Sequence, residues 1–312
     1  MSGGNAFDLG SCLEEIAAEI AANAADIEAK ADAKEEGLDP GPFGIAVTTM
    51  DGETFCGGMA DRRFPLQSIA KVFTLEIVLD AIGERIFERV GREPSGDPFN
   101  SIIDLERTEG IPRNPFVNAG ALVTVDAMLH AQCPRDAVID LVKRELGRDV
   151  PLDEDVLASE EKGGDLNRAM LSFMKHHDNL LSEPDDVMSA YVRQCAISLD
   201  VAGLSQVGMF LARTRLDGDD ESRERAMRMR KLLALMMTCG HYDGSGDFAL
   251  RVGLPAKSGV GGGILTVMPQ VASIAAWSPN LDQHGNSILG VHALEMLVKR
   301  TGWSVFGPPV GS

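Results

Sequence analysis

The sequence predicts an α+β fold, with an antiparallel sheet built from both ends of the chain and flanked by helices, and a helical lobe from the middle. Strand-like stretches lie near both ends, at 43–59 and 248–277, whereas residues from about 117 to 240 follow helical periodicity. Terminal strands usually meet in one sheet, which leaves the middle as a separate lobe. We therefore expect an N-terminal helical segment at 1–40 and a single domain at 41–312. Within this domain, about 41–66 and 245–312 form a sheet lobe, and about 67–244 form a helical lobe.

The N-terminal part supplies helices and a hairpin. Residues 7–33 are rich in Ala, Glu, Ile and Leu and predict one or two helices, which Gly37 and Pro40 close. The Asp51-Gly52 pair is a strong hairpin turn between two strands. After it we expect a helix that contains Ser68 and then a loop rich in proline and glycine. We place the two strands at 43–49 and 53–59, the helix at 68–90 and the loop at 91–99.

The middle of the chain predicts helices, and strand character returns after them. The helices are placed at 119–132, 135–146, 167–175, 183–199, 201–213 and 221–238, and the strands at 248–252, 263–268 and 271–277. A closing helix is expected at 287–300. His176-His177-Asp178 lacks a matching His or Glu pair at helical spacing, so we interpret it as a helix terminus and expect no metal site.

Composition excludes several classes of partner. The 312-residue chain carries a net charge of −18, which argues against nucleic acid or an anionic membrane surface. Its five cysteines are widely spaced and form no C-x-x-C pair, which favours a reducing compartment. There is no secretory pattern and no apolar run long enough to span a membrane, so we expect a cytoplasmic protein.

Ser68 and Lys71 form an S-x-x-K motif at the start of an apolar helix, just after Pro65. Positions three apart share one helical face, so the serine hydroxyl and the lysine amine can meet. Burial makes a lysine lose its proton more easily. A neutral lysine can then take the serine proton and turn the hydroxyl into a nucleophile.

Lys257-Ser258-Gly259 opens a glycine-rich stretch directly before a strand. A phosphate-binding loop requires the opposite order, with glycines before the lysine and a helix after them, so nucleotide binding is excluded. The pattern resembles the K-T/S-G element that serine penicillin-recognising enzymes pair with S-x-x-K. Glycines there let a substrate approach the backbone and offer N–H groups to an oxyanion. Lys257 would also lie near Lys71 and favour its neutral form.

Taken together, the motifs resemble the serine-dependent glutaminases of bacteria. The resemblance covers roughly residues 40 to 305 and is carried by the stretches 43–46, 67–75, 113–121, 159–160, 165–169, 191–195, 237–243 and 251–263. It implies a serine β-lactamase-like fold, hydrolysis of glutamine to glutamate and ammonia, a homodimer or homotetramer, and neither a metal nor an organic cofactor.

The resemblance also implies roles for individual residues. Ser68 falls on the nucleophile and Lys71 on the general base, and the Ser68 and Val260 N–H groups would form the oxyanion hole. The chemistry agrees, because a carboxylate can hold the substrate ammonium, carboxamides can donate to its carboxylate and a phenol can relay a proton. The resemblance implies Glu160 as this carboxylate, Asn118 and Asn167 as the carboxamides, and Tyr242 as the phenol. Tyr191 is a further substrate-binding position. Lys257, Ser258 and Gly259 are secondary candidates.

One segment departs from this family. Its members usually carry a Tyr-Ile-Pro segment before the first strand, whereas residues 24–31 contain neither tyrosine nor proline, and Asp26 is the nearest counterpart. Two alternatives therefore stay open. One is another acyl-transfer enzyme on this fold, such as a β-lactamase or a peptidase. The other is a non-catalytic protein that binds glutamine or another amino acid.

Overall fold

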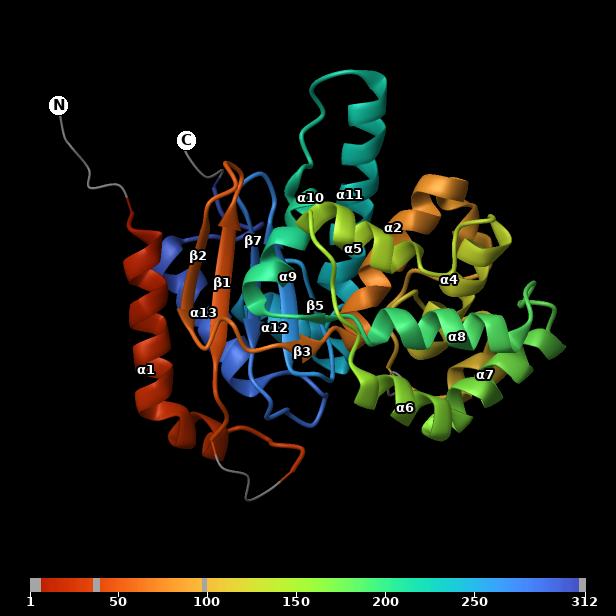
Figure 1. Cartoon of the computed structure of the whole chain (residues 1–312), viewed down its shortest axis with the longest axis horizontal. Coiled ribbons are helices and arrows are strands. Elements are labelled where there is room, and N and C mark those ends of the chain that lie inside the picture. The colour runs from red at the N-terminus through yellow and green to blue at the C-terminus, as the bar shows by residue number, and fades with distance from the viewer. Residues whose placement is uncertain (1–6, 36–39, 97–99, 309–312) are drawn as a thin grey trace.

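The computed structural model describes residues 7–35, 40–96 and 100–308, without the side chains of residues 160–163; Gly37 and residues 97–99 of the expected loop therefore lie outside the described residues. Its main sheet has five antiparallel strands in the order β2-β1-β7-β6-β5 (Figure 1). In chain order the strands are β1 Gly44–Thr49, β2 Thr54–Gly58, β5 Ala256–Ser258, β6 Gly263–Met268 and β7 Ala272–Trp277. Since β1 pairs with β7, both chain ends build one sheet, and the predicted α+β class is confirmed.

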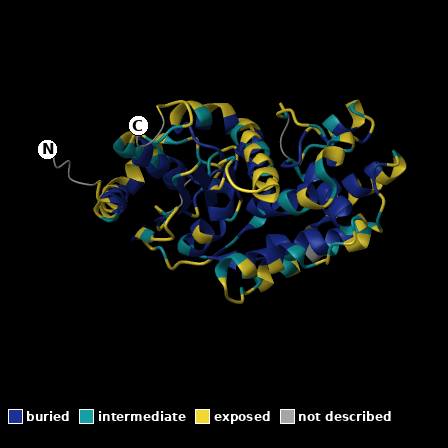
Figure 2. Ribbon diagram, turned by 90° about the horizontal axis from the view of Figure 1, so that it is seen from above, coloured by how far each residue is buried: buried dark blue, intermediate teal, exposed yellow. Residues whose placement is uncertain are grey.

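Both faces of this sheet are buried, because alternate side chains of each strand point to opposite sides. Ile45, Val47 and Ile274 pack into a core with α1 (Leu9–Lys30) and α13 (Ile288–Thr301). The side chains between them, Ala46 and Ala275, belong to the second core, which the helices of the middle of the chain complete. Figure 2 shows buried residues running through both parts of the molecule. The sheet thus lies between two layers of helices and offers a rigid support.

Helix α2 (Ala70–Ile82) occupies the centre of the helical part and is buried over most of its length. Helices α4 (Asn118–His130), α5 (Ala137–Leu146) and α11 (Asp220–Cys239) pack against it. The remaining helices are α3 Ile103–Arg107, α6 Glu154–Gly163, α7 Asp165–His176, α8 Pro184–Cys195, α9 Val201–Val207, α10 Met209–Ala212 and α12 Ser245–Arg251. Two short strands, β3 (Phe64–Pro65) and β4 (Ser198–Leu199), pair with each other where the helical part meets the sheet.

The strand predicted at 248–252 is wrong, because these residues belong to α12 and its C-terminal end. Phe248 and Val252, one helical turn apart, are both buried, whereas Leu250 between them is 86% exposed. The Phe248 ring stacks on the buried His241 imidazole with 3.7 Å between ring centroids. The strand that precedes β6 is β5 instead, and it includes Lys257 and Ser258.

Two predicted helices are shorter than expected. The one beginning near Ser68 ends at Ile82 rather than at 90, because Gly83 takes a φ of 63° and a 3₁₀ segment follows. The helix expected over 183–199 ends at Cys195, since residues 198–199 pair with 64–65. Short helices at 103–107 and 154–163 were not predicted.

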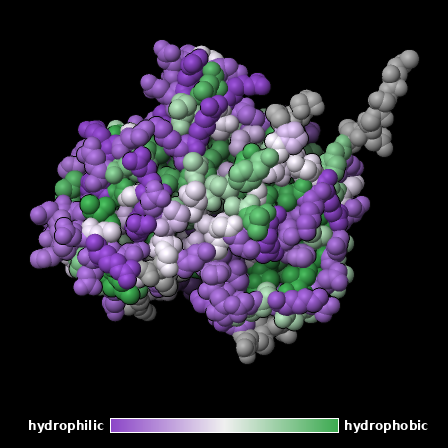
Figure 3. Space-filling view, turned by 180° about the vertical axis from the view of Figure 1, so that it is seen from behind, coloured by the Kyte–Doolittle hydropathy of each residue, from purple (hydrophilic) through white to green (hydrophobic). Residues whose placement is uncertain are grey.

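The surface combines hydrophilic and apolar areas. Seen from behind, most of the face is hydrophilic, and apolar residues gather mainly over the side that carries the sheet (Figure 3). None of the helices within the described ranges has the length and apolar character needed to cross a bilayer.

An ion pair links the two long helices of the helical part. Arg228 of α11 lies 2.7 Å from Asp80 and 3.6 Å from Glu76, both on α2. The Glu76 side chain is only 12% exposed, and its Oε2 has no hydrogen-bond partner among the described residues. Burial, opposed by Arg228, raises the pKa of the Glu76 carboxyl from 4.5 to about 7.

Glu76 should therefore make the stability of the protein depend on pH. A carboxyl with a raised folded-state pKa stabilises the fold fully below its unfolded-state value of 4.5 and loses this contribution as the pH rises through about 7. We expect Glu76→Gln to match the unaltered protein at pH 4.5 and to exceed its unfolding free energy by roughly 3 kcal/mol at pH 8. Urea unfolding across this range measures the difference. A difference that does not change with pH, as expected for the exposed control Glu183→Gln, would contradict the prediction.

Candidate active site

Ser68 lies in a 3₁₀ turn (Gln67–Ile69) immediately before α2 and is 6% exposed. The preceding residue, Gln67, has a φ of 48°, which non-glycine residues rarely adopt and which is often found at functional turns. A backbone hydrogen bond anchors the turn, because the Leu66 N–H donates to the Ile197 carbonyl at 2.8 Å. Ser68 is thus held where the helical part meets the sheet.

Lys71 follows in the first turn of α2 and is almost completely buried, with 1% exposure. Its Nζ donates to the Phe116 carbonyl at 3.0 Å and to Asn118 Oδ1 at 2.8 Å. Asn118 is the first residue of α4 and donates through Nδ2 to Asn167 Oδ1 of α7 at 3.3 Å. Three helices therefore bring a lysine and two carboxamides together beside Ser68.

The glycine-rich stretch lies directly against the turn of Ser68. A Cβ on Gly259 would come within 2.6 Å of the Leu66 carbonyl oxygen, so only glycine permits this approach. The Val260 N–H has no acceptor among the residues that the structure describes. The expected role of this N–H in the oxyanion hole stays a prediction.

Tyr242 is the first residue of a 3₁₀ segment (Tyr242–Gly244) and contacts Ser68. Its backbone φ of 54° is uncommon for an aromatic residue. The phenol hydrogen-bonds to Ser68, and its hydroxyl also lies 3.5 Å from the Ser258 carbonyl. Burial raises the pKa of Tyr242 to about 12, so the phenol is a proton donor at neutral pH.

Lys257 is a second fully buried lysine next to this group. Its Nζ donates to the carbonyls of Gly240 (3.1 Å) and Ser258 (2.6 Å) and lies 4.3 Å from the centre of the Tyr242 ring. Burial, together with the charge of Lys71, lowers the pKa of Lys257 well below its ordinary value. Repulsion between these two buried amines disfavours a state in which both are charged.

The structure describes two other predicted site residues, Tyr191 and Glu160, in less detail. Tyr191 is buried in α8, a helix that packs against the turn of Ser68. Glu160 belongs to α6, and its side chain lies outside the described part of the structure. Its role as the ammonium ligand therefore stays a prediction.

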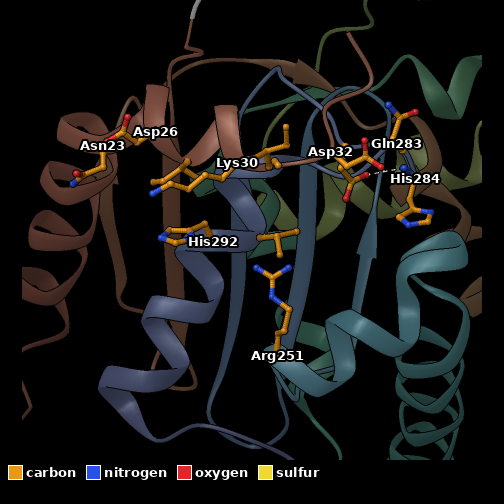
Figure 4. Close-up of a pocket in the computed structure, with 13 residues that line it drawn as sticks. Asn23, Asp26, Lys30, Asp32, Arg251, Gln283, His284 and His292 are labelled. Atoms are coloured by element: carbon orange, nitrogen blue, oxygen red, sulfur yellow. Dashed lines mark hydrogen bonds between the residues drawn. The ribbon is translucent and has the colours of Figure 1, made fainter. Parts of the chain in front are cut away.

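Asp26 lies apart from this group. Figure 4 shows it on the wall of a cavity of about 460 Å³ between α1, α13 and the segment 282–284, and neither Ser68 nor Lys71 lines this cavity. His176, expected at a helix terminus, is the last residue of α7. The described residues contain no group of three His, Cys, Asp or Glu side chains suited to a metal ion.

Sequence reasoning missed two contributors to the site. The Phe116 carbonyl accepts a hydrogen bond from Lys71, and Asn114 closes the turn that carries it. A backbone acceptor has no signature in the sequence, because every residue type carries the same carbonyl. The only available signal was the Asn114-Pro115 pair, which is typical of a turn.

Comparisons with known proteins agree on one family. The family model described as Glutaminase matches residues 34–306. The glutaminase of Agrobacterium fabrum is 51% identical over 277 residues, covering 86% of this chain and 89% of that protein. The solved structure of a probable glutaminase, YbaS, has a TM-score of 0.80 at 32% identity and covers 96% and 99% of the two chains. A structure of the Bacillus subtilis glutaminase YbgJ, in covalent complex with 5-oxo-L-norleucine, has a TM-score of 0.78 at 25% identity, covering 96% and 100%.

Proposed function

This chain belongs to the glutaminase family, and from that premise we propose that it hydrolyses L-glutamine to L-glutamate and ammonia through an acyl-enzyme on Ser68. The observation that carries the mechanism is the environment of Lys71. Its Nζ donates to Phe116 O and Asn118 Oδ1, which hold the amine in the first turn of α2, close in sequence to Ser68. In its neutral form this amine has a lone pair that can accept the proton of the Ser68 hydroxyl.

In the acylation half of the reaction, Lys71 takes the proton of Ser68 as Oγ attacks the side-chain carbonyl carbon of glutamine. The N–H groups of Ser68 and Val260 hold the oxyanion that forms. The carbon–nitrogen bond then breaks, and the nitrogen leaves as ammonia after receiving a proton. Tyr242, which is hydrogen-bonded to Ser68 and protonated at neutral pH, can pass that proton on from the Lys71 ammonium.

In the second half, water replaces ammonia. Lys71, neutral again, takes a proton from water, whose oxygen attacks the glutamyl ester on Ser68. The ester bond breaks, Ser68 recovers its proton and glutamate leaves. No step requires a metal ion or an oxidant, since all the bonds change by acyl and proton transfer.

We assign the orientation of the substrate to the polar residues around Ser68 and Lys71. Asn118 gives its oxygen to Lys71 and directs its nitrogen toward Asn167, so the carboxamide nitrogens of these two residues are suited to the substrate carboxylate. Glu160 would hold the ammonium, and Tyr191 would line the cleft. This arrangement selects an α-amino acid with a terminal carboxamide.

The test of the function is the release of ammonia and glutamate, in equal amounts, from L-glutamine by the purified protein. A chromogenic β-lactam and a glutamine-binding measurement are run beside it. Hydrolysis of the β-lactam with no ammonia from glutamine would favour another acyl hydrolase of this fold. Binding of glutamine without any release would favour a non-catalytic amino-acid binding protein.

Removal of the Tyr242 hydroxyl should slow the reaction more than it weakens substrate binding. We expect Tyr242→Phe to lower kcat on the order of 100-fold, as for loss of a group that transfers a proton, with a small change in KM. Steady-state kinetics of ammonia release measures both constants, and circular dichroism checks the fold. An unchanged kcat would show that the phenol takes no part in the proton transfer.

The location and assembly of the protein are further proposals. We propose that the enzyme works in the reducing cytoplasm, which is supported by five cysteines that are all free. We also propose a homodimer or homotetramer, which rests on the family. Light scattering of the purified protein determines the assembly.

A further inference from the structure

The turn that precedes α4, residues 114–118, is closed by one buried side chain. Asn114 is 2% exposed, and its Oδ1 accepts from the N–H groups of Phe116 at 2.9 Å and of Val117 at 3.1 Å. Its Nδ2 donates to the Glu93 carbonyl at 2.9 Å. The side-chain oxygen faces two donors and the nitrogen faces an acceptor, so these contacts fix which end of the carboxamide is which.

The Asn114 oxygen accepts from the two N–H groups that follow Pro115, which itself has no N–H. The turn is also pressed against α4, because a Cβ on Gly120 would lie 1.9 Å from the Asn114 carbonyl oxygen. The position of the turn is therefore set jointly by Asn114 and by the first turn of α4.

The same turn supplies two acceptors of Lys71. The Phe116 carbonyl and Asn118 Oδ1 lie 3.0 and 2.8 Å from Nζ and hold the amine in place. The orientation of the amine therefore depends on where these two oxygens lie. A shift of the Phe116 peptide would therefore rotate the amine away from Ser68.

We propose that Asn114 is a positioning residue for the general base: through the turn 114–118 it aims the Phe116 carbonyl and Asn118 at Lys71 and so orients the lysine lone pair toward Ser68. This inference rests on the proposed function of Lys71. It assigns Asn114 no contact with the substrate, so its effect falls on kcat and on the pH profile.

The test compares Asn114→Ala and Asn114→Asp with the unaltered protein. Asn114→Ala removes the acceptor, and we expect kcat to fall on the order of 100-fold, as for a small misplacement of a catalytic group. The acidic limb of the kcat/KM profile should move to lower pH, because a carbonyl oxygen that accepts from an amine favours its charged form. Asn114→Asp keeps the acceptor for both N–H groups but loses the donor to the Glu93 carbonyl, so it should recover kcat in part, about tenfold above Asn114→Ala.

Asn179→Ala is the matched control. Asn179 is also a buried carboxamide, and it bonds to the Arg89 and Gly110 carbonyls at 2.9 and 2.8 Å without contacting Lys71 or its acceptors. It should lower the melting temperature about as much as Asn114→Ala while leaving kcat and the acidic limb unchanged. Assays are run below both melting temperatures. If Asn114→Ala does not fold, Asn114→Ser, a weaker acceptor, should give an intermediate kcat.

The outcomes separate this inference from the mechanism on which it rests. If Asn114→Ala, or Asn114→Ser in its place, behaves like the control, with lowered stability but unchanged kcat and pH profile, Asn114 is only structural and the inference is overturned. The role of Lys71 is untouched by that result. If Lys71→Met itself keeps full kcat, the mechanism fails, and the inference fails with it.

Discussion

Ser68→Ala should reduce glutamine hydrolysis by at least about 10,000-fold, since no acyl-enzyme can form without the hydroxyl. The substitution removes one buried oxygen from a 3₁₀ turn whose backbone is anchored by Leu66 and Ile197, so the fold should persist. Glutamine should still bind, because the carboxamides of Asn118 and Asn167 remain. The measurements are kcat from ammonia release and glutamine binding by calorimetry.

The control for this variant is Ser205→Ala. Ser205 is also buried and hydrogen-bonded, to Thr48 Oγ1 at 2.8 Å, but it lies in α9 on the sheet. It should keep full activity. As a second readout, 6-diazo-5-oxo-L-norleucine, the reagent used with the B. subtilis relative, should add mass to the unaltered protein and not to Ser68→Ala. Labelling of Ser68→Ala, or retained turnover, would place the nucleophile elsewhere.

Lys71→Met should lower kcat on the order of 1,000-fold, within the range for loss of a general base. Methionine keeps much of the buried volume but leaves Phe116 O and Asn118 Oδ1 without their donor, so stability should also fall. Labelling by the same reagent should slow, because Ser68 loses the group that takes its proton. Rates of labelling and turnover are measured over the same pH range.

Lys71→Arg distinguishes a base from a fixed positive charge. A guanidinium keeps charge and donors but does not lose its proton, so this variant should be about as inactive as Lys71→Met. The surface control Lys175→Met, which removes only an exposed ion pair with Glu183, should leave activity unchanged. Substantial activity in Lys71→Arg would mean that Lys71 acts through its charge and that another group accepts the serine proton.

The sequence was most informative where local chemistry decides the structure. The S-x-x-K spacing predicts two side chains near the start of one helix, and the structure places Ser68 and Lys71 there, both buried. The glycines after Lys257 predict a close backbone approach, and Gly259 lies against Leu66. Both patterns depend on residue types with few alternative uses, a buried lysine and consecutive glycines.

Prediction failed where tertiary contacts decide. Residues 248–252 have a mostly apolar composition that suits either a strand or a helix, and the stacking of Phe248 on His241 is a packing contact that favours the helix. The end of α8 at Cys195 depends on pairing with residues far earlier in the chain. The acceptors of Lys71 include a main-chain oxygen, which no side-chain pattern reveals.

The pairing of β1 with β7 has a consequence for biosynthesis. The partner of β1, residues 272–277, is made more than about 200 residues after β1 itself. Until then the β1 edge of the newly made hairpin lacks its partner strand, and other nascent chains could pair with it. Closure of so distant a pair is slow, and the protein should therefore depend on chaperones for its yield more than a protein with local contacts does.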